Sequence, residues 1–412
     1  MTVSAIVLSG HTMGLGVARA LGRMGVPVVM FHYPERDLAR VSRYVVESVA
    51  APNPEHDEEG FIEKLVDYGT RRGGGVLMPT SDETVVAVAR HKARLKQYFM
   101  VACPDWAVAE RFIDKKHTYA LAEAVGVPAP KTFVPGSLEE VEEKARLLGF
   151  PCLVKPSTGH LFYTHFRRKM FPVDDLDALV RLYREATEAG LQVLLQEIIP
   201  GDDRHGVNYN AYAWDGRALV EFTARKVRNA PPWYGSPRVA ISEAIPEVIE
   251  PGRRILQALQ FSGFACTEFK KDDRDGVYKL MEINGRHNLS TLLAVACGIN
   301  FPWLEYQHHI SGEIPAPRDF RKGVYWIDLT RDIGYSVAYA RKERYSIADY
   351  LRPYLKPHVF AILDYKDPKP FVRRTLLLLR QGLRQALTRL QPRRASPRGV
   401  RPLRSVQDTK KP

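Results

Sequence analysis

The residues best suited to chemistry lie in the stretch Leu280-Met-Glu282-Ile-Asn284-Gly-Arg286, with Glu268 a short distance before it. Residues two apart on a strand share a face, so Glu282 and Asn284 should point the same way, and a hairpin would place Glu268 beside them. Two carboxylates and an amide oxygen suit a Mg²⁺ ion that bridges nucleotide phosphates. Arg286 follows the same face and could hold an oxyanion or a phosphate. Taken alone, an edge hairpin with solvated acids explains the pattern equally well.

Four basic residues could supply the fixed cations that phosphoryl chemistry requires. Lys155 ends the apolar run Phe150-Pro-Cys-Leu-Val, which predicts a buried stem and a fixed ammonium group. Lys115 follows an aspartate at the predicted start of a helix, and Lys226 and Arg228 alternate along a predicted strand. Lone lysines are usually solvated, so this set indicates a phosphate site only together with the other motifs.

A third signal is an apolar strand, 193–199, that runs out into Pro200-Gly201. Such a strand end exposes backbone groups that can hydrogen-bond an adenine edge, and an acid a few residues later can take ribose hydroxyls. These roles would fall to the residues at the end of this strand and just beyond it, Gln196, Glu197, Ile199 and Asp203. An ordinary strand that ends in a polar turn is the alternative.

Three segments must position these residues. Residues 1–103 alternate short apolar strands with helical segments, a βαβ rhythm that predicts an α/β domain with a parallel, doubly wound sheet. Residues 104–190 mix helices with the strand that ends at Lys155. Residues 191–315 alternate as antiparallel strands, with a hairpin turn at Asp215-Gly216, and this pattern predicts an α+β module.

A glycine-rich turn after the first strand, Gly10-x-x-x-Gly14-x-Gly16, is similar to a dinucleotide fingerprint. Its spacing is offset from G-x-G-x-x-G, and the second strand ends at Phe31-His32-Tyr33 without an acid for the ribose. We therefore expect a tight turn and a helix that starts near Val17, not an NAD site.

The last part of the chain differs from the rest. Residues 316–390 form a C-terminal extension, whose stretch Phe371–Leu390 places apolar residues at helical spacing with arginines off the stripe, and residues 391–412 turn to Pro, Arg and Ser. The first pattern predicts an amphipathic basic helix and the second a disordered tail.

The net charge of +13 is concentrated in that part. Residues 371–412 carry twelve Lys and Arg against one acid, Asp408, so the preceding residues are nearly neutral. A basic amphipathic helix can lie on an anionic membrane surface. Packing of its apolar stripe on the body of the protein, and non-specific nucleic-acid binding by the tail, are the alternatives. For the body we expect no specific nucleic-acid partner.

The N-terminus lacks a basic segment followed by a long apolar one and is interpreted as a first buried strand. No window holds 18 uncharged apolar residues. The four cysteines show no C-x-x-C spacing, and a chain of this size does not need a disulfide scaffold. These features predict a cytoplasmic protein.

In this order and spacing, the motifs resemble the ATP-grasp superfamily over roughly residues 1–315. Asp114-Lys115, Gly126-Val-Pro-Ala-Pro130 and the strand ending at Lys155 look like its N-terminal subdomain, and 196–203 looks like the hinge that binds adenine and ribose. Glu268, Glu282, Asn284 and Arg286 look like its magnesium and phosphate residues, and residues 1–103 are similar to its Rossmann-like pre-ATP-grasp domain. Within the superfamily the chain is most similar to carboxylate–amine ligases, including D-aspartate ligases, and to relatives of the carbamoyl-phosphate synthetase large chain.

The resemblance implies a ligase that uses ATP and Mg²⁺, with Mn²⁺ as an alternative, to activate a carboxylate as an acyl phosphate for attack by an amine. Its partners would be small-molecule carboxylates and amines, and a homodimer is an open option. Lys115 and Lys155 would neutralise phosphates, and Arg286, with Lys226 and Arg228, would act on the acyl phosphate. Carbamoyl-phosphate-type or kinase-like transfer, and a nucleotide-binding regulatory protein without turnover, remain as alternatives.

The chain departs from the family pattern in one place. Many ATP-grasp enzymes follow the strand lysine with a glycine-rich phosphate loop, whereas residues 156–170 here hold one glycine, Gly159, among several basic and aromatic residues. Such a loop could cover phosphates with side-chain cations instead of backbone amides.

Overall fold

The computed structural model describes residues 3–390, except 35–36, 158–161, 163–164, 167, 169, 234 and 344. The predicted tail at 391–412 and most of the basic loop after Lys155 lie outside the described residues. Two units divide the chain, one ending at Phe371 and the other starting at Val372, and the first contains all three sheets.

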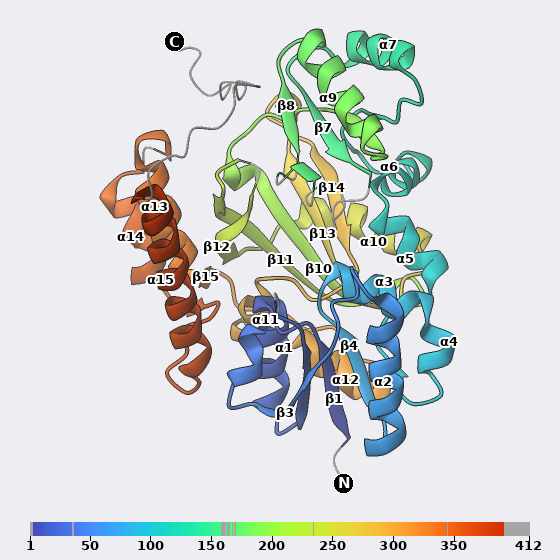
Figure 1. Ribbon diagram of the computed structural model, residues 1–412, viewed down its shortest axis with the longest axis vertical. Coiled ribbons are helices and arrows are strands. Elements are labelled where there is room, and N and C mark those ends of the chain that lie inside the picture. The colour runs from blue at the N-terminus through green and yellow to red at the C-terminus, as the bar shows by residue number, and fades with distance from the viewer. Residues whose placement is uncertain are drawn as a thin grey trace. The chain divides into compact units, whose positions relative to one another are not determined.

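The first sheet is parallel, with the strand order β3-β2-β1-β4-β5 (Figure 1). Its strands are β1 (Ser4–Leu8), β2 (Val28–His32), β3 (Val45–Ala50), β4 (Gly75–Pro79) and β5 (Met100–Val101). The helices around it are α1 (Thr12–Gly22), α2 (Glu58–Arg72), α3 (Asp82–Arg90) and α4 (Lys92–Leu95). Helix α1 packs into a different core cluster from α2 and α3, so helices cover both faces of the sheet. The prediction of a doubly wound α/β domain is confirmed.

Helix α1 begins at Thr12, five residues before the predicted start at Val17. Two glycines of the turn motif therefore lie inside the helix. A side chain at Gly14 would meet the Ser9 carbonyl oxygen at 2.0 Å, so glycine lets the helix pack directly against the end of β1. The glycine motif therefore allows α1 to pack closely against the end of β1.

The second sheet is antiparallel and has four strands in the order β6-β9-β7-β8. Its strands are β6 (Thr132–Phe133), β7 (Cys152–Pro156), β8 (Phe171–Val173) and β9 (Val193–Glu197). Helices α7 (Leu138–Leu148) and α9 (Leu176–Glu188) share its core, and α5 (Trp106–Ile113) and α6 (Lys115–Ala124) precede it. This small sheet carries Lys155 and the predicted adenine segment.

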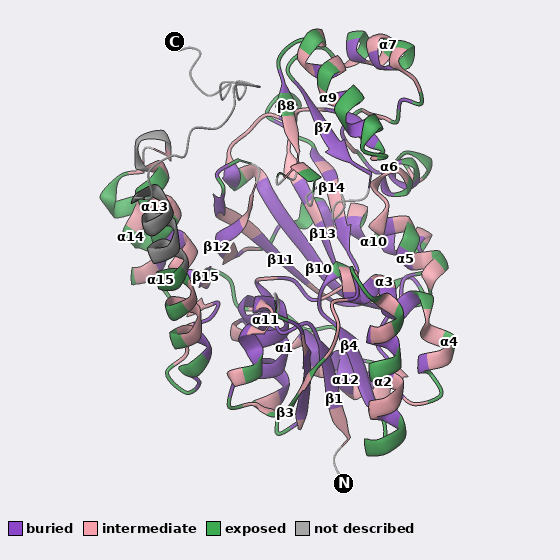
Figure 2. Cartoon of the chain, in the orientation of Figure 1, coloured by how far each residue is buried: buried purple, intermediate pink, exposed green. Residues whose placement is uncertain are grey.

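The third sheet has seven strands in the order β14-β13-β10-β11-β12-β15-β16. They are β10 (Gly206–Trp214), β11 (Arg217–Ala230), β12 (Ser236–Ser242), β13 (Gly263–Lys271), β14 (Tyr278–Asn284), β15 (Tyr325–Ile327) and β16 (His358–Phe360). Both predicted hairpins are present, as β10–β11 and β13–β14. The strands in its middle are largely buried (Figure 2). Helices α10 (Ile249–Ala258), α11 (Thr291–Ala296) and α12 (Phe301–Ser311) accompany the sheet.

The C-terminal extension is part of this sheet. Strands β15 and β16 extend it, while α13 (Leu329–Glu343) contacts β11 and β12, and α14 (Ile347–Leu355) contacts β15. The segment after β16 returns to the first domain, where buried Arg19 donates to Asp367 Oδ2 at 3.0 Å and to the Ile362 carbonyl at 2.8 Å.

Helix α15 (Lys369–Leu390) confirms the predicted C-terminal helix. Short 3₁₀ helices cover Leu38–Val41, Asp203–His205 and Pro246–Val248. Within the part of the chain that the structure describes, no helix combines the length and the apolar character needed to span a membrane.

Candidate active site

The three predicted metal ligands lie on the adjacent strands β13 and β14. Glu268 is the register partner of Glu282, and Asn284 pairs with Cys266 two positions along β13. Residues opposite one another in antiparallel strands share a face, so both carboxylates and the amide project to the same side of the sheet. The register thus has the hairpin that the sequence predicts, and a metal-binding role for these side chains stays a prediction.

Each carboxylate of this pair meets a lysine from another element. Lys115 Nζ, at the start of α6, lies 3.0 Å from Glu282 Oε1, and Lys226 on β11 donates to Glu268. Burial acts to lower the pKa of both lysines, but the facing carboxylates outweigh it and raise each pKa above the usual value. Both lysines therefore stay protonated and fixed at the carboxylates.

This donor set fits a magnesium ion. Among the described residues, no three His, Cys, Asp or Glu side chains gather into a metal cage. A cation here would take two carboxylates and the Asn284 amide, and Mg²⁺ typically completes such a set with phosphate oxygens and water. Asn208, the register partner of Glu268 on β10, adds a buried Oδ1 atom without a hydrogen-bond partner in the described structure.

Arg286 joins this strand end to the first domain. Its guanidinium holds Asp82, the first residue of α3, through Nε at 2.7 Å and Nη2 at 3.1 Å, and Nη2 also donates to Asn284 Oδ1 at 3.0 Å. Burial opposes the effect, yet Asp82 raises the pKa of Arg286, and Arg286 lowers the pKa of Asp82. Arg286 thus places a permanent positive charge next to the predicted metal ligands.

The loop after Arg286 is held by a buried pair. His287 Nε2 lies 2.9 Å from Glu305 Oε2 on α12, and the other oxygen of Glu305 accepts from the Phe264 backbone N–H at 3.2 Å. The His287 ring also stacks on the ring of Phe264. These contacts fix the backbone that carries Arg286.

Two further lysines, one on the small sheet and one on the large sheet, lie close enough for their charges to interact. Lys155 on β7 is 6% exposed, and Lys270 on β13 donates to the Ile199 carbonyl at 2.8 Å. Burial lowers the pKa of Lys270 and the charge of Lys155 adds to this effect, whereas the charges of Asp203, Asp202 and Asp273 oppose it. Among the described residues, no carboxylate pairs with either lysine, so an anion placed between them would gain two favourable contacts.

The predicted adenine and ribose residues make different contacts in the structure. Gln196 is buried and donates to Thr132 Oγ1 at 2.8 Å. The Glu197 side chain accepts from the Lys131 backbone N–H and from Arg274, both at 2.8 Å. The Ile199 carbonyl meets Lys270, which places this part of the hinge beside the cation pair.

Asp203 is not presented to a ribose. It is 6% exposed and accepts from the backbone N–H groups of Asn229 and Trp233 at 2.8 and 2.7 Å, and from the Asn229 side chain at 3.0 Å. Burial raises its pKa, and these hydrogen bonds oppose the rise. The structure therefore uses Asp203 to hold residues 229–233, which corrects the prediction of a ribose contact.

Arg228 does not join the site either. Strand β11 bulges at Val227. Lys226 and Arg228, two positions apart on β11, therefore pair with the adjacent β12 residues Ala240 and Val239. Such a bulge sends the two basic side chains to opposite faces. Arg228 is fully buried against α13, where it donates to both oxygens of Asp332 at 2.9 and 2.8 Å. Arg228 therefore has a structural role, which corrects the prediction of a catalytic one.

Three residues of the site were missed from the sequence. Lys270 lies two positions after Glu268, so the alternation that grouped Glu282 with Asn284 would have found it. Asn208 alternates in the same way along β10. Asp82 lies in the stretch Thr80-Ser-Asp-Glu83, which is similar to the carboxylate–amine ligase group, but its contact with Arg286, 204 positions away, depends on the tertiary fold.

Comparisons with solved structures settle the fold. An L-amino acid ligase from Bacillus licheniformis superimposes with a TM-score of 0.59 at 19% identity, covering 76% of this chain and 78% of that one. The biotin carboxylase domain of the Hydrogenobacter thermophilus 2-oxoglutarate carboxylase, in complex with MgADP, superimposes with a TM-score of 0.64 at 16% identity. The match covers 79% of this chain and 74% of that one. The chain has the ATP-grasp fold.

Curated relatives of the chain include ligases and carbamoyl phosphate synthase large chains. D-aspartate ligase from Enterococcus faecium is 26% identical over 262 residues, which are 58% of this chain and 61% of the relative. A D-alanine–D-alanine ligase from Ectopseudomonas mendocina and the carbamoyl phosphate synthase large chain from Thermotoga neapolitana match 47% and 52% of this chain at 25% and 26% identity. The chain spans less than two thirds of each relative's length. No family model matches it.

Proposed function

We propose that the chain is an ATP- and Mg²⁺-dependent ligase that activates a carboxylate as an acyl phosphate and transfers the acyl group to an amine. The observation that carries this proposal is the shared face of Glu268, Glu282 and Asn284, flanked by Arg286. The curated relatives support the reaction class, because two of them are named as ligases that act on amino acids.

The charge of each described residue indicates its role in this reaction. Lys155 and Lys270 would bind the phosphates of ATP at the hinge, and Glu268, Glu282 and Asn284 would hold Mg²⁺, which would offset the negative charge of the phosphates. The substrate carboxylate attacks the γ-phosphorus atom and ADP leaves. The amine then attacks the acyl carbon and phosphate leaves, while Arg286 stabilises the negative charge that develops on the acyl phosphate.

A coupled-product assay tests this function. The chain is mixed with ATP, Mg²⁺ and a matrix of small carboxylates and amines, and ADP and phosphate are both measured. We expect equal ADP and phosphate release that requires one carboxylate and one amine together. ADP formation without phosphate would instead indicate a kinase-like reaction, and two ADP for each phosphate would indicate a carbamoyl-phosphate-type reaction. Nucleotide binding without any ADP formation would indicate a regulatory protein.

The location and assembly of the protein are also proposals. We propose a cytoplasmic protein that acts on small molecules, and a homodimer remains a candidate because the Hydrogenobacter biotin carboxylase domain is described as a dimer.

We further propose that residues 371–412 contact anionic membrane surfaces, because a helix with a leucine stripe precedes a segment rich in arginine. Full-length protein should sediment with vesicles that contain anionic lipid at low salt and should be released at high salt, since each basic residue near the surface adds about 1 kcal/mol. Protein truncated after residue 370 and neutral vesicles are the controls. Equal sedimentation of the full-length and truncated proteins would rule this contact out.

A further inference from the structure

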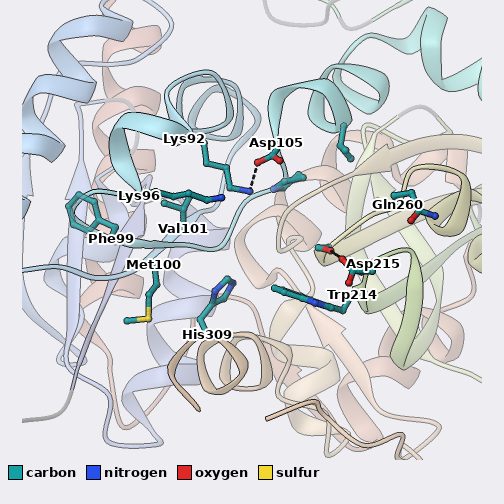
Figure 3. A pocket seen from close by; sticks show the side chains of 13 residues that line it. Lys92, Lys96, Phe99, Met100, Val101, Asp105, Trp214, Asp215, Gln260 and His309 are labelled. Atoms are coloured by element: carbon teal, nitrogen blue, oxygen red, sulfur yellow. Dashed lines mark hydrogen bonds and ion pairs between the residues drawn. The ribbon is translucent and has the colours of Figure 1, made fainter. Parts of the chain in front are cut away.

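A cavity of about 480 Å³ is lined by none of the candidate metal and phosphate residues (Figure 3). It is formed where α4, β5 and the start of α5 meet the β10–β11 turn and the end of α12. Trp214 in its wall is six positions along β10 from Asn208, which is roughly 20 Å at the rise of a β-strand. The cavity is therefore separate from the metal and phosphate residues, and its size is within the range of small-molecule sites.

One side of this cavity is basic. Lys92 and Lys96 extend into it from the same helical segment, with His309 below them (Figure 3). Lys92 is 16% exposed and pairs with Asp105 at 2.7 Å, whereas Lys96 is exposed and has no acid in contact among the described residues. Burial lowers the pKa of His309, so its ring is neutral near pH 7 and can still form hydrogen bonds. This side can take a carboxylate.

The other side of the cavity has the opposite character. Asp215, at the tip of the β10–β11 turn, is exposed and lies with Gln260 across the cavity from the lysines (Figure 3). Ser262 Oγ donates to Asp215 Oδ1 at 3.4 Å and accepts from the Asp215 backbone N–H at 2.9 Å. This side can take an ammonium group.

Apolar and aromatic surface lies between the two charged sides. The indole of Trp214 forms one wall and is held by His308, whose ring centre lies 4.3 Å away. The facing residues are apolar and come from β5 and its flanks, namely Phe99, Met100, Val101, Pro104 and Val108. An apolar or aromatic side chain would gain contact area on this surface.

We infer that this cavity is a second ligand site that takes a small zwitterion of amino-acid or dipeptide size. The carboxylate of the ligand contacts Lys92 and Lys96, its ammonium group contacts Asp215, and its side chain packs on Trp214. Charge complementarity at both ends selects a zwitterion over a simple anion, because a simple anion leaves Asp215 without a partner. The inference does not depend on the proposed ligase activity.

Helix α12 connects this second site to the candidate active site. His309 lines the cavity, and one turn earlier Glu305 holds His287, the neighbour of Arg286. His308 between them accepts or donates a hydrogen bond at 2.8 Å with Tyr212 on β10. Helix α12 therefore extends from this cavity to the contact that fixes the backbone beside Arg286.

Binding of L-phenylalanine, N-acetyl-L-phenylalanine and phenethylamine, measured by calorimetry, tests the site on the full chain. L-phenylalanine carries both charges, N-acetyl-L-phenylalanine carries only the carboxylate, and phenethylamine carries only the ammonium group. We expect the zwitterion to bind the wild-type chain best. Lys96→Ala and Asp215→Asn should each weaken its binding by about tenfold or more, since each removes a charge-assisted hydrogen bond. Lys96→Arg should restore most of it.

Glu282→Gln serves as the matched control for binding at the other site. It should leave the cavity's binding event unchanged, whereas loss of binding in this variant would assign the event to the candidate active site and overturn the inference. Equal binding by the wild type, Lys96→Ala and Asp215→Asn would overturn it as well, as would a wild-type chain that binds none of the probes. Because Lys96 and Asp215 are exposed, both variants should fold, and circular dichroism checks this.

Discussion

Glu282→Gln is expected to abolish ligase turnover while the chain remains folded. The substitution keeps the size of the side chain but removes one of the two charges that would hold Mg²⁺. Loss of a metal's charge stabilisation is worth several kcal/mol, so kcat should fall by about a thousandfold or more. The Glu282 side chain is 40% exposed, and its ion pair with Lys115 is therefore expected to add little stability. Steady-state ADP release at saturating Mg²⁺ and a thermal melt measure the two effects.

The matched control is Glu63→Gln, which makes the same chemical change at an exposed position of α2. It should leave both turnover and melting temperature unchanged. Normal turnover by Glu282→Gln would remove Glu282 from the metal site. A loss of turnover together with a large drop in melting temperature would show that its pairing with Lys115 is structural.

The positions of site residues could be predicted from the sequence wherever they depend on alternation along a strand. Glu282 and Asn284 share a face because they are two positions apart, and the Asp/Gly-rich turn after Lys271 closes the hairpin that brings Glu268 opposite Glu282. The apolar run before Lys155 likewise predicted a buried strand with a fixed lysine at its end. Each of these inferences uses contacts between residues that are close in sequence or paired by a short turn.

The sequence failed where regular alternation breaks. Lys226 and Arg228 have the spacing of residues on one face, but the bulge at Val227 separates them. Nothing in the local sequence indicates that bulge. Its cause is tertiary, since Asp332 lies more than 100 positions away and binds Arg228 on the far face. Asp203 was misassigned for a related reason, because its partners lie at the end of β11 and in the loop that follows it.

Removing the carboxylate of Asp332 is expected to be the most destabilising single change in the C-terminal extension. Asp332 is fully buried and accepts from Arg228 at 2.9 and 2.8 Å, from Arg238 at 2.8 Å and from the Tyr354 hydroxyl at 2.6 Å. Arg228 and Arg238 are also fully buried, and among the described residues Glu343 forms an ion pair with Arg238 but none with Arg228. Asp332→Ala would therefore leave Arg228 charged and without a carboxylate inside the protein.

Breaking a buried ion pair from one side costs about 3–5 kcal/mol, because the remaining charge loses its partner but stays out of water. We expect Asp332→Ala to lower the free energy of unfolding by that amount in urea denaturation, and Asp332→Asn, which can still accept hydrogen bonds, by less. Asp319→Asn, at an exposed position before β15, is the control and should change stability by no more than about 0.5 kcal/mol. A loss below about 1 kcal/mol for Asp332→Ala would mean that water or a rearranged Glu343 takes over the charge of Arg228, and the extension would then not be anchored through this cluster.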